Sequence, residues 1–299
     1  MKTLIGLTLS LLAVSNATRC SDVAGTLKQL DAGIGMVFGV NHTGSIYTRV
    51  GNSWIQLPGK LKHVTVGPAG IWGVDQDRRI YRLVAGNWVS FFGVTWLEEG
   101  AGRAEGAGRG RRGGRSLSGC DGTEANPAPS SLPDGKLTQL DAGGDQIVAG
   151  VDQFGSTFCI GPQELASAVI NRSASFSSIG SRMRYYSCGP LGCWGVTLAK
   201  DVYYRLNVKP SACIGTSWSR VFGKFQNIEV GSDGRVFGIS VTRQLYTRKG
   251  VTVNRPTGWG WTKIEIGNLR FNHASWDLGH LWLVRVDGKI VKCSSEDID

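Results

Sequence analysis

The chain is 299 residues long and basic, with 33 Lys and Arg against 23 Asp and Glu and a formal net charge of +10. A basic surface attracts polyanions such as lipopolysaccharide, teichoic acids and sulphated glycans. Nucleic acid would be attracted by the same charge, but a secreted protein, as the leader described next predicts, would not meet it. Beyond this leader the sequence has no apolar run long enough to span a bilayer, so we expect no insertion into a membrane.

Residues 1–17 have the pattern of a secretory signal peptide. Met1 and Lys2 precede an apolar run from Leu4 to Val14, and small residues up to Ala17 follow. A short charged start, an apolar core and a small-residue cleavage site define such a leader. We therefore expect cleavage after Ala17 and a soluble, secreted, extracellular mature protein.

The rest of the sequence repeats one unit six times. The clearest copy spans residues 54–86, and its pattern Gly-x-Leu-x-x-Val-x-Val-Gly, then Trp-Gly-Val-Asp, then Ile-Tyr returns in the same order elsewhere. A fixed internal period identifies a repeat architecture. The other copies cover residues 27–47, 137–158, 185–204, 225–246 and 271–291.

Each copy divides into four short runs of alternating apolar residues, separated by Gly, Asn or Asp. In the clearest copy the runs cover residues 61–66, 71–74, 79–84 and 87–91. Val, Ile, Tyr and Trp fill them, which favours β-strands, and no later segment shows sustained helical periodicity. Four strands per unit indicate a β-propeller blade. The sequence predicts an all-β, six-bladed β-propeller with four-stranded antiparallel blades, closed by the N- and C-terminal segments.

Two sets of glycines recur in the units. Those that end the first run, such as Gly33 and Gly67, are expected to need a backbone conformation that only glycine adopts at low cost. Those inside the second run, such as Gly39 and Gly73, are expected to permit close packing. We expect the neighbouring aromatic residues, such as Trp72, to lie in the core rather than on a ligand.

Residues 94–135 interrupt the repeat between the second and third blades. The segment is rich in Gly, Ala, Arg and Pro, and nothing in it can build a core. A loop this long is uncommon within a compact domain. We expect a disordered insertion, with blades one and two in residues 18–93 and blades three to six in residues 136–299 of one domain.

The seven cysteines suit an oxidising compartment. Cys120 lies in the insertion and is the odd one. The other six allow fifteen pairings. We hypothesise one bond between the two ends of the array, one across a turn and one between neighbouring repeats, namely Cys20–Cys293, Cys188–Cys193 and Cys159–Cys213. No Cys-x-x-Cys motif or histidine cluster favours a metal site instead.

Two sequons remain in the mature chain, Asn41-His-Thr and Asn171-Arg-Ser, and we expect glycosylation at Asn41 and Asn171 in a secreted protein. The chain ends in an acidic tail. Together with Asp22 near the other end, this tail could hold a cation, or it could be a solvated tail without a ligand.

The pattern Trp-x-x-Leu-Pro-Gly-x-Leu-x-x-Val-x-Val-Gly, with Trp-Gly-Val-Asp and Ile-Tyr after it, resembles the tectonin repeat. The segments GTLKQLDAG, YYSCGPLGCWGV and SWDLGHLWLV are similar to those of fish egg lectins. The resemblance covers Cys20 to Cys293 apart from the insertion. It implies a propeller lectin of egg protection or innate immunity that binds N-acetylglucosamine-type and bacterial surface glycans, including lipopolysaccharide and peptidoglycan. The resemblance is also compatible with a structural calcium ion near the chain ends, and it leaves open whether the chain forms a homodimer.

The sequence offers no catalytic constellation. Metalloprotease, nucleophile-elbow and phosphate-loop motifs are all missing from it. Asp31 and Asp141 recur at equal positions of their repeats, which indicates turn or inter-blade hydrogen bonds rather than an acid–base pair. We therefore expect no enzyme.

Sugar recognition needs polar groups on rigid loops and an aromatic face. The position after the second run holds Asn41, Asp75 and Asp152, each able to bond a sugar hydroxyl or acetamido group. The alternative is that each forms an Asx-turn. In the last copy three residues break the repeat pattern and complete the predicted carbohydrate-binding set, namely Trp276, Asp277 and His280. A secreted protein-interaction propeller without sugar affinity remains the alternative function.

Overall fold

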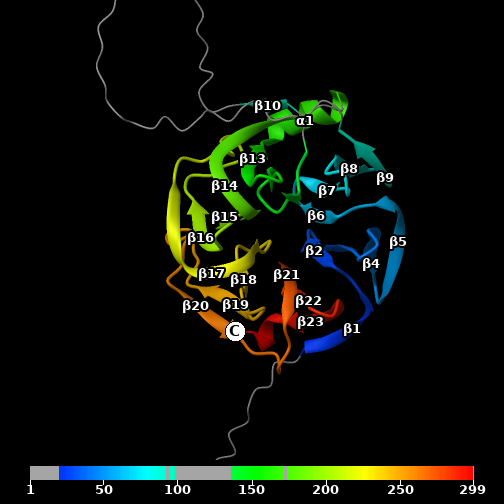
Figure 1. The fold of residues 1–299 in the computed structure, drawn as a ribbon, viewed down its shortest axis with the longest axis vertical. Helices are drawn as coiled ribbons and strands as arrows, with labels where there is room; N and C mark the ends of the chain where they lie inside the picture. The colour runs from blue at the N-terminus through cyan, green and yellow to red at the C-terminus, as the bar shows by residue number, and fades with distance from the viewer. Residues whose placement is uncertain (1–19, 92–94, 98–135, 172–173, 299) are drawn as a thin grey trace, which may run out of the picture.

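The computed structural model describes residues 20–91, 95–97, 136–171 and 174–298. The predicted signal peptide, Cys120 and most of the predicted insertion lie outside these ranges. Within them the chain is built almost entirely of antiparallel strands, and Figure 1 shows the sheets standing in a circle around a central axis. The prediction of an all-β chain of four-stranded units is confirmed.

The first two repeats each form one four-stranded antiparallel sheet. The strands of the second sheet begin and end within two residues of the predicted runs. The first sheet contains β2 (Gln29–Gly33), β3 (Met36–Val40), β4 (Ser45–Val50) and β5 (Ser53–Lys60), and the second contains β6 (His63–Gly67), β7 (Gly70–Val74), β8 (Ile80–Val84) and β9 (Asn87–Ser90).

The next three repeats share two long strands. One half of β14 pairs with β13 and the other half with β15, and β17 joins β16 to β18 in the same way. The three four-stranded groups therefore form one continuous ladder. Its members are β11 (Gln139–Asp141), β12 (Val148–Val151), β13 (Ser156–Ile160), β14 (Ser175–Gly189), β15 (Gly192–Thr197), β16 (Asp201–Arg205), β17 (Trp218–Val230), β18 (Val236–Ser240), β19 (Leu245–Lys249) and β20 (Gly260–Ile264).

The first strand of the described chain completes the last sheet. β21 (Phe271–Asp277), β22 (His280–Arg285) and β23 (Lys289–Ser294) form a meander, and β1 (Cys20–Thr26) pairs with β23 at its outer edge. A short 3-10 helix, η1 (Ser295–Asp297), follows β23. Cys20 lies opposite Cys293 and is bonded to it. The predicted Cys159–Cys213 and Cys188–Cys193 bonds are also present.

Two elements differ from the prediction. The segment after β13 forms a helix, α1 (Pro162–Asn171), although no helix was expected. Its Leu165 and Ala168 pack into the core beneath it, so tertiary burial supports a helix too short to show a period in sequence. Thr95–Leu97, inside the predicted insertion, forms β10 and pairs in parallel with β14. No helix among the described residues is long and apolar enough to cross a membrane.

The glycines that end the innermost strands are needed for space, not for an unusual backbone. Neither Gly33 nor Gly67 has a positive φ, so the predicted reason is wrong. A Cβ on Gly67 would lie 2.0 Å from the carbonyl oxygen of Ala142 in the next sheet, and one on Gly33 would lie 2.3 Å from that of Val66. Adjacent sheets therefore touch backbone to backbone at these points.

Inside the second strands, glycine has the predicted role. A Cβ on Gly39 would lie 2.5 Å from Cδ1 of Leu27, and one on Gly73 would lie 2.4 Å from Cδ1 of Leu61. Trp72 is fully buried, as expected.

Polar side chains on the innermost strands connect each sheet to the next. Oδ2 of Asp31 accepts from the backbone N–H of Val66 at 2.8 Å, and Oδ1 of Asp141 accepts from that of Cys188 at 3.0 Å, which confirms the predicted inter-sheet hydrogen bonds. Further sheet-to-sheet bonds run from Gln29 to Val64, from Ala142 to Thr65, from Gln139 to Tyr186, from Val230 to Ser187, from Asn227 to Asn272 and from Ser275 to Asp31.

Near the central axis, His63 is buried and neither ring nitrogen has a hydrogen-bond partner among the described residues. Burial, with the charges of His273, Lys62 and Lys28, lowers the pKa of His63 to about 3. A histidine in the unfolded chain has a pKa near 6.5. Between these values the unfolded chain binds one more proton than the folded chain, so stability is lost as pH falls.

We expect His63→Gln to remove this acid sensitivity, because glutamine does not titrate. The variant should fold, because Gln29 and Gln139 occupy the same position in two other repeats. Below pH 6.5, the free energy of unfolding of the wild-type protein should fall more steeply with falling pH than that of the variant, by up to about 1.4 kcal/mol per pH unit. Urea unfolding at pH 7.5, 5.5 and 4.5 measures the difference. Burial and the charge of Glu229 raise the pKa of Asp31 to about 6. This raised pKa makes stability increase as pH falls, but Asp31 is present in both proteins, so its effect cancels in the comparison. Equal slopes in the two proteins would contradict the assignment to His63.

Candidate functional site

The six predicted sugar-binding residues lie at two opposite ends of the sheets. Asn41, Asp75 and Asp152 follow the second strand of their sheets, at what we call the upper end. The hairpin that joins β21 to β22 carries the other three at the lower end. The structure therefore does not bring the predicted set together into one site.

At the upper end, the three residues form the same turn. Oδ1 of Asn41 accepts from the N–H of Ser45 at 2.8 Å, and Oδ1 of Asp75 accepts from that of Arg79 at 2.9 Å. Oδ1 of Asp152 accepts from Ser156 at 2.8 Å. Each side chain thus stabilises its own loop, as an Asx-turn does.

The second carboxylate oxygen distinguishes Asp152 from Asp75. Oδ2 of Asp75 accepts from the hydroxyl of Tyr81 at 3.1 Å. Oδ2 of Asp152 is buried and has no partner within the described chain. A buried carboxylate oxygen without a donor is costly, so Asp152 is the member of this set best prepared to accept from a ligand.

At the lower end, Trp276 and Asp277 hold neighbouring sheets together. Trp276 is 2% exposed, and its ring stacks on Phe237 with centroids 5.4 Å apart. Its Nε1 donates to Asp233 at 2.8 Å. Oδ2 of Asp277 accepts from the N–H of Gly35 at 2.7 Å. The ring of Trp276 is therefore covered, and the carboxylate of Asp277 is occupied by contacts within the protein.

His280 lies near them and is half-buried. Its Nδ1 has no partner within the described residues, and burial with the charge of Lys292 lowers its pKa. No sugar-binding role follows from this position alone.

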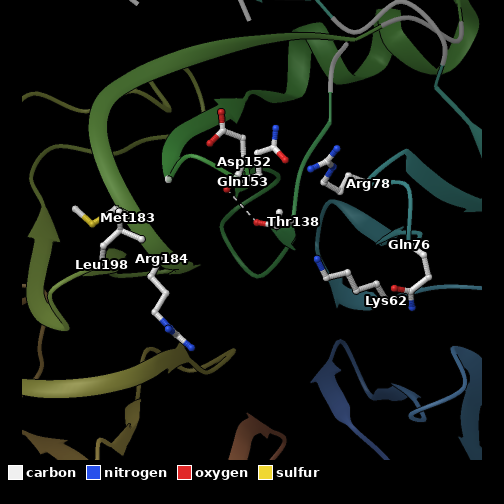
Figure 2. A pocket seen from close by; sticks show the side chains of 10 residues that line it. Lys62, Gln76, Arg78, Thr138, Asp152, Gln153, Met183, Arg184 and Leu198 are labelled. Atoms are coloured by element: carbon white, nitrogen blue, oxygen red, sulfur yellow. Dashed lines mark hydrogen bonds between the residues drawn. The ribbon is translucent and has the colours of Figure 1, made fainter. Parts of the chain in front are cut away.

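The upper end contains a pocket of about 380 Å³ between the second, third and fourth units, a volume suited to a small ligand. Figure 2 shows Lys62, Gln76 and Arg78 on one side of it, with Thr138, Asp152 and Gln153 across from them. Gly155, Met183, Arg184 and Leu198 complete the lining. Of the predicted residues, only Asp152 lines this pocket.

The sequence patterns did not identify the cations of the pocket. Lys62 and Arg184 line the pocket. Each is the second residue of the repeat motif that leads into the innermost strand, and Lys28 holds this position in the first repeat. A basic residue at this position in three of the six repeats was the available signal. Burial, with the charges of Lys28 and Arg78, lowers the pKa of Lys62, which reflects the positive charge gathered here.

The described side chains near the chain ends do not form a calcium site. The carboxylate of Asp22 is exposed and lies 4.0 Å from the guanidinium of Arg285. No group of three or more His, Cys, Asp or Glu side chains that could hold an ion occurs in the part of the chain that the structure describes. Calcium remains a prediction from the resemblance.

Comparison with known sequences identifies one family. A family model described as Tectonin domain matches residues 26–95 and 129–286, so the match is interrupted within the predicted insertion. The chain is 38% identical over 160 residues to the fish-egg lectin of Cyprinus carpio, an alignment that covers 53% of this chain and 67% of that protein. It is 33% identical over 92 residues to a tectonin beta-propeller repeat-containing protein of Drosophila melanogaster, covering 28% of this chain and 7% of the relative.

Solved structures support the fold alone. YCF48 from Cyanidioschyzon merolae superposes with a TM-score of 0.52 at 12% identity, covering 88% of this chain and 80% of that one. YCF48 bound to D1 peptide superposes with a TM-score of 0.51 at 10% identity, covering 90% and 78%. At these identities no ligand or partner can be carried over.

Proposed function

Because the chain belongs to the tectonin family, we propose that it is a secreted lectin that binds glycans through the pocket at the upper end of its sheets. The pocket, with its convergent polar side chains, is the observation that supports this function in a chain related to a fish-egg lectin. The proposed ligands are N-acetylglucosamine-type and bacterial surface glycans, encountered in egg protection or innate immunity.

The proposed architecture is a six-bladed β-propeller closed by its terminal strands. Six four-stranded groups, each linked to the next by side-chain hydrogen bonds, support this number. The pairing of β1 with β23 and the bond from Ser275 to Asp31 support the closure. A ring presents similar loops several times on one face, so weak single contacts can add up on a multivalent surface. The three disulfides suit the proposed extracellular location.

We propose no catalytic role, since the family relative is a lectin and the pocket's chemistry is that of recognition. A propeller that binds a protein partner without sugar affinity is the competing function. A glycan array separates the two. Binding that free sugar competes away supports the lectin, whereas an empty array with a defined protein partner supports the alternative. Whether the protein forms a homodimer stays a prediction.

We expect Asp152→Asn to weaken sugar binding at least tenfold while leaving the fold intact. Asn41 forms the same turn in the first repeat, so asparagine can replace the Oδ1 acceptor of Asp152. Only Oδ2, which has no partner, changes from an acceptor to a donor. Titration calorimetry with the best sugar from the array measures the loss. Asp287→Asn makes the same exchange in a turn of the last repeat outside this pocket, where Oδ1 of Asp287 accepts from the N–H of Lys289, and is the matched control. Unchanged affinity would exclude Asp152 as a contact but leave the lectin function standing.

A further inference from the structure

The charge of the pocket indicates which class of sugar it can bind. Its lining carries three cationic side chains, Lys62, Arg78 and Arg184, and one carboxylate, that of Asp152. The formal sum is 3 − 1 = +2. A neutral sugar would leave this charge uncompensated, whereas a sugar with an acidic group would balance it.

These cations differ from others on the same face. Arg79 pairs with Asp77 at 2.7 Å, and both Arg220 and Lys224 pair with Asp201 at 2.9 Å. Within the described chain, by contrast, no ion pair joins Lys62, Arg78 or Arg184 to a carboxylate. The ion pairs found there are those of Arg79, Arg220, Lys224, Arg235, Lys263, His273 and Arg285.

Arg78 is held in a backbone conformation that is unfavourable for it. Its φ is +69°, in the left-handed region, where a non-glycine residue costs roughly 1 kcal/mol or more. Glycine fills the corresponding turn position in the first, third and last repeats, and Lys200 and Arg243 fill it in the fourth and fifth, all with positive φ. The backbone N–H of Arg78 donates to Asp75, and its carbonyl accepts from Leu137, so the residue is fixed in place. The turn therefore holds Arg78 in a fixed place at the wall of the pocket.

We propose that this pocket binds a sugar bearing a carboxylate or a phosphate, with the acidic group held between Lys62 and Arg78. The inference rests on the proposed lectin function and adds the ligand class. The planar guanidinium of Arg78 can donate two parallel hydrogen bonds to such a group, and the ammonium of Lys62 adds a point charge. Gln76, Thr138 and Gln153 offer partners for the ring hydroxyls. Leu198, which is 58% exposed, supplies an apolar edge for the sugar's carbon face.

Matched sugar pairs test the inference on the mature chain. Calorimetry at 50 mM salt compares glucuronic acid with glucose, and N-acetylglucosamine 6-phosphate with N-acetylglucosamine. We expect the acidic member of at least one pair to bind tenfold or more tightly, and the gain to shrink at 0.5 M salt because charge interactions are screened. A gain in only one pair identifies the acidic group as carboxylate or phosphate.

Two double variants with the same charge change locate the effect. Lys62→Gln with Arg78→Gln should abolish the difference in affinity between the acidic and the neutral member of a pair. Lys60→Gln with Arg79→Gln, which removes cations outside the pocket lining, should retain it. Thermal unfolding checks that both variants are folded.

Three results would overturn the inference. Equal affinity for acidic and neutral members in both pairs rejects it while leaving the lectin function intact. Displacement of the sugar phosphate by inorganic phosphate at equal concentration indicates a free-anion site instead of a sugar site. A preference that survives in the Lys62/Arg78 variant places the acidic group elsewhere. Absence of binding to any sugar rejects the lectin function itself, which is a distinguishable outcome.

Discussion

Replacing Cys20 and Cys293 by serine should lower the free energy of unfolding by roughly 2–5 kcal/mol and the melting temperature by roughly 5–15 °C. The bond closes a loop of 273 residues, and a cross-link stabilises more when the loop it closes is longer, because it removes more freedom from the unfolded chain. It also ties β1 to the edge of the last sheet. Calorimetric melting of both proteins under oxidising conditions measures the change.

The Cys188–Cys193 bond provides the control. It spans a sequence separation of only 5, so its replacement by two serines should cost about 2 kcal/mol or less. If this pair costs as much as Cys20–Cys293, loop length does not explain the stabilisation.

Gly67→Ala should be the most damaging change of a single methyl group, at about 3 kcal/mol or more. The added Cβ would lie 2.0 Å from the carbonyl oxygen of Ala142 and 2.9 Å from Cα of Gly143. Both are backbone atoms of the neighbouring innermost strand, so they cannot rotate away as a side chain could. The second and third sheets would have to separate, and the side chains that pack between them would lose contact.

Chemical denaturation of Gly67→Ala and Gly260→Ala tests this expectation. Gly260 begins β20 and does not have a positive φ, and a Cβ added to it would meet no atom within 4 Å. Its substitution should change the stability by less than about 0.5 kcal/mol. A loss of less than about 1 kcal/mol in Gly67→Ala would mean that the sheets can move apart freely.

The repeat made much of the fold predictable. Because the same apolar alternation returns in every copy, an error in one copy is corrected by the others, and the strands of the second sheet were placed closely. The helix α1 was not predicted. Among its described side chains Leu165 and Ala168 are buried, and two positions one turn apart define no period. Tertiary packing, which a local pattern does not contain, decides such a segment.

The site was less predictable because it is made between repeats. Lys62, Asp152 and Arg184 belong to three successive units, and their distance depends on how the sheets face each other. Within one repeat, the pattern identified the turn at Asp152 but not what lies across from it.

Trp276 shows that a departure from the repeat can also reflect packing between sheets. Its departure from the repeat suggested a ligand, but the ring fills the space beside Gly231, where an added Cβ would lie 2.4 Å from Cδ1 of Trp276. A large residue in one sheet is matched by the absence of a side chain in the next.

The Cys20–Cys293 bond has a consequence for how the chain can be cut. With this bond formed, residues 20 to 293 make a covalent circle, and one peptide cleavage anywhere between them leaves a single molecule. The circle has no obligatory beginning. New ends opened among residues 98–135, between β10 and β11, would interrupt no described strand, and the present ends could be joined in their place. The order in which the units are synthesised is thus separable from the order in which they stand around the axis.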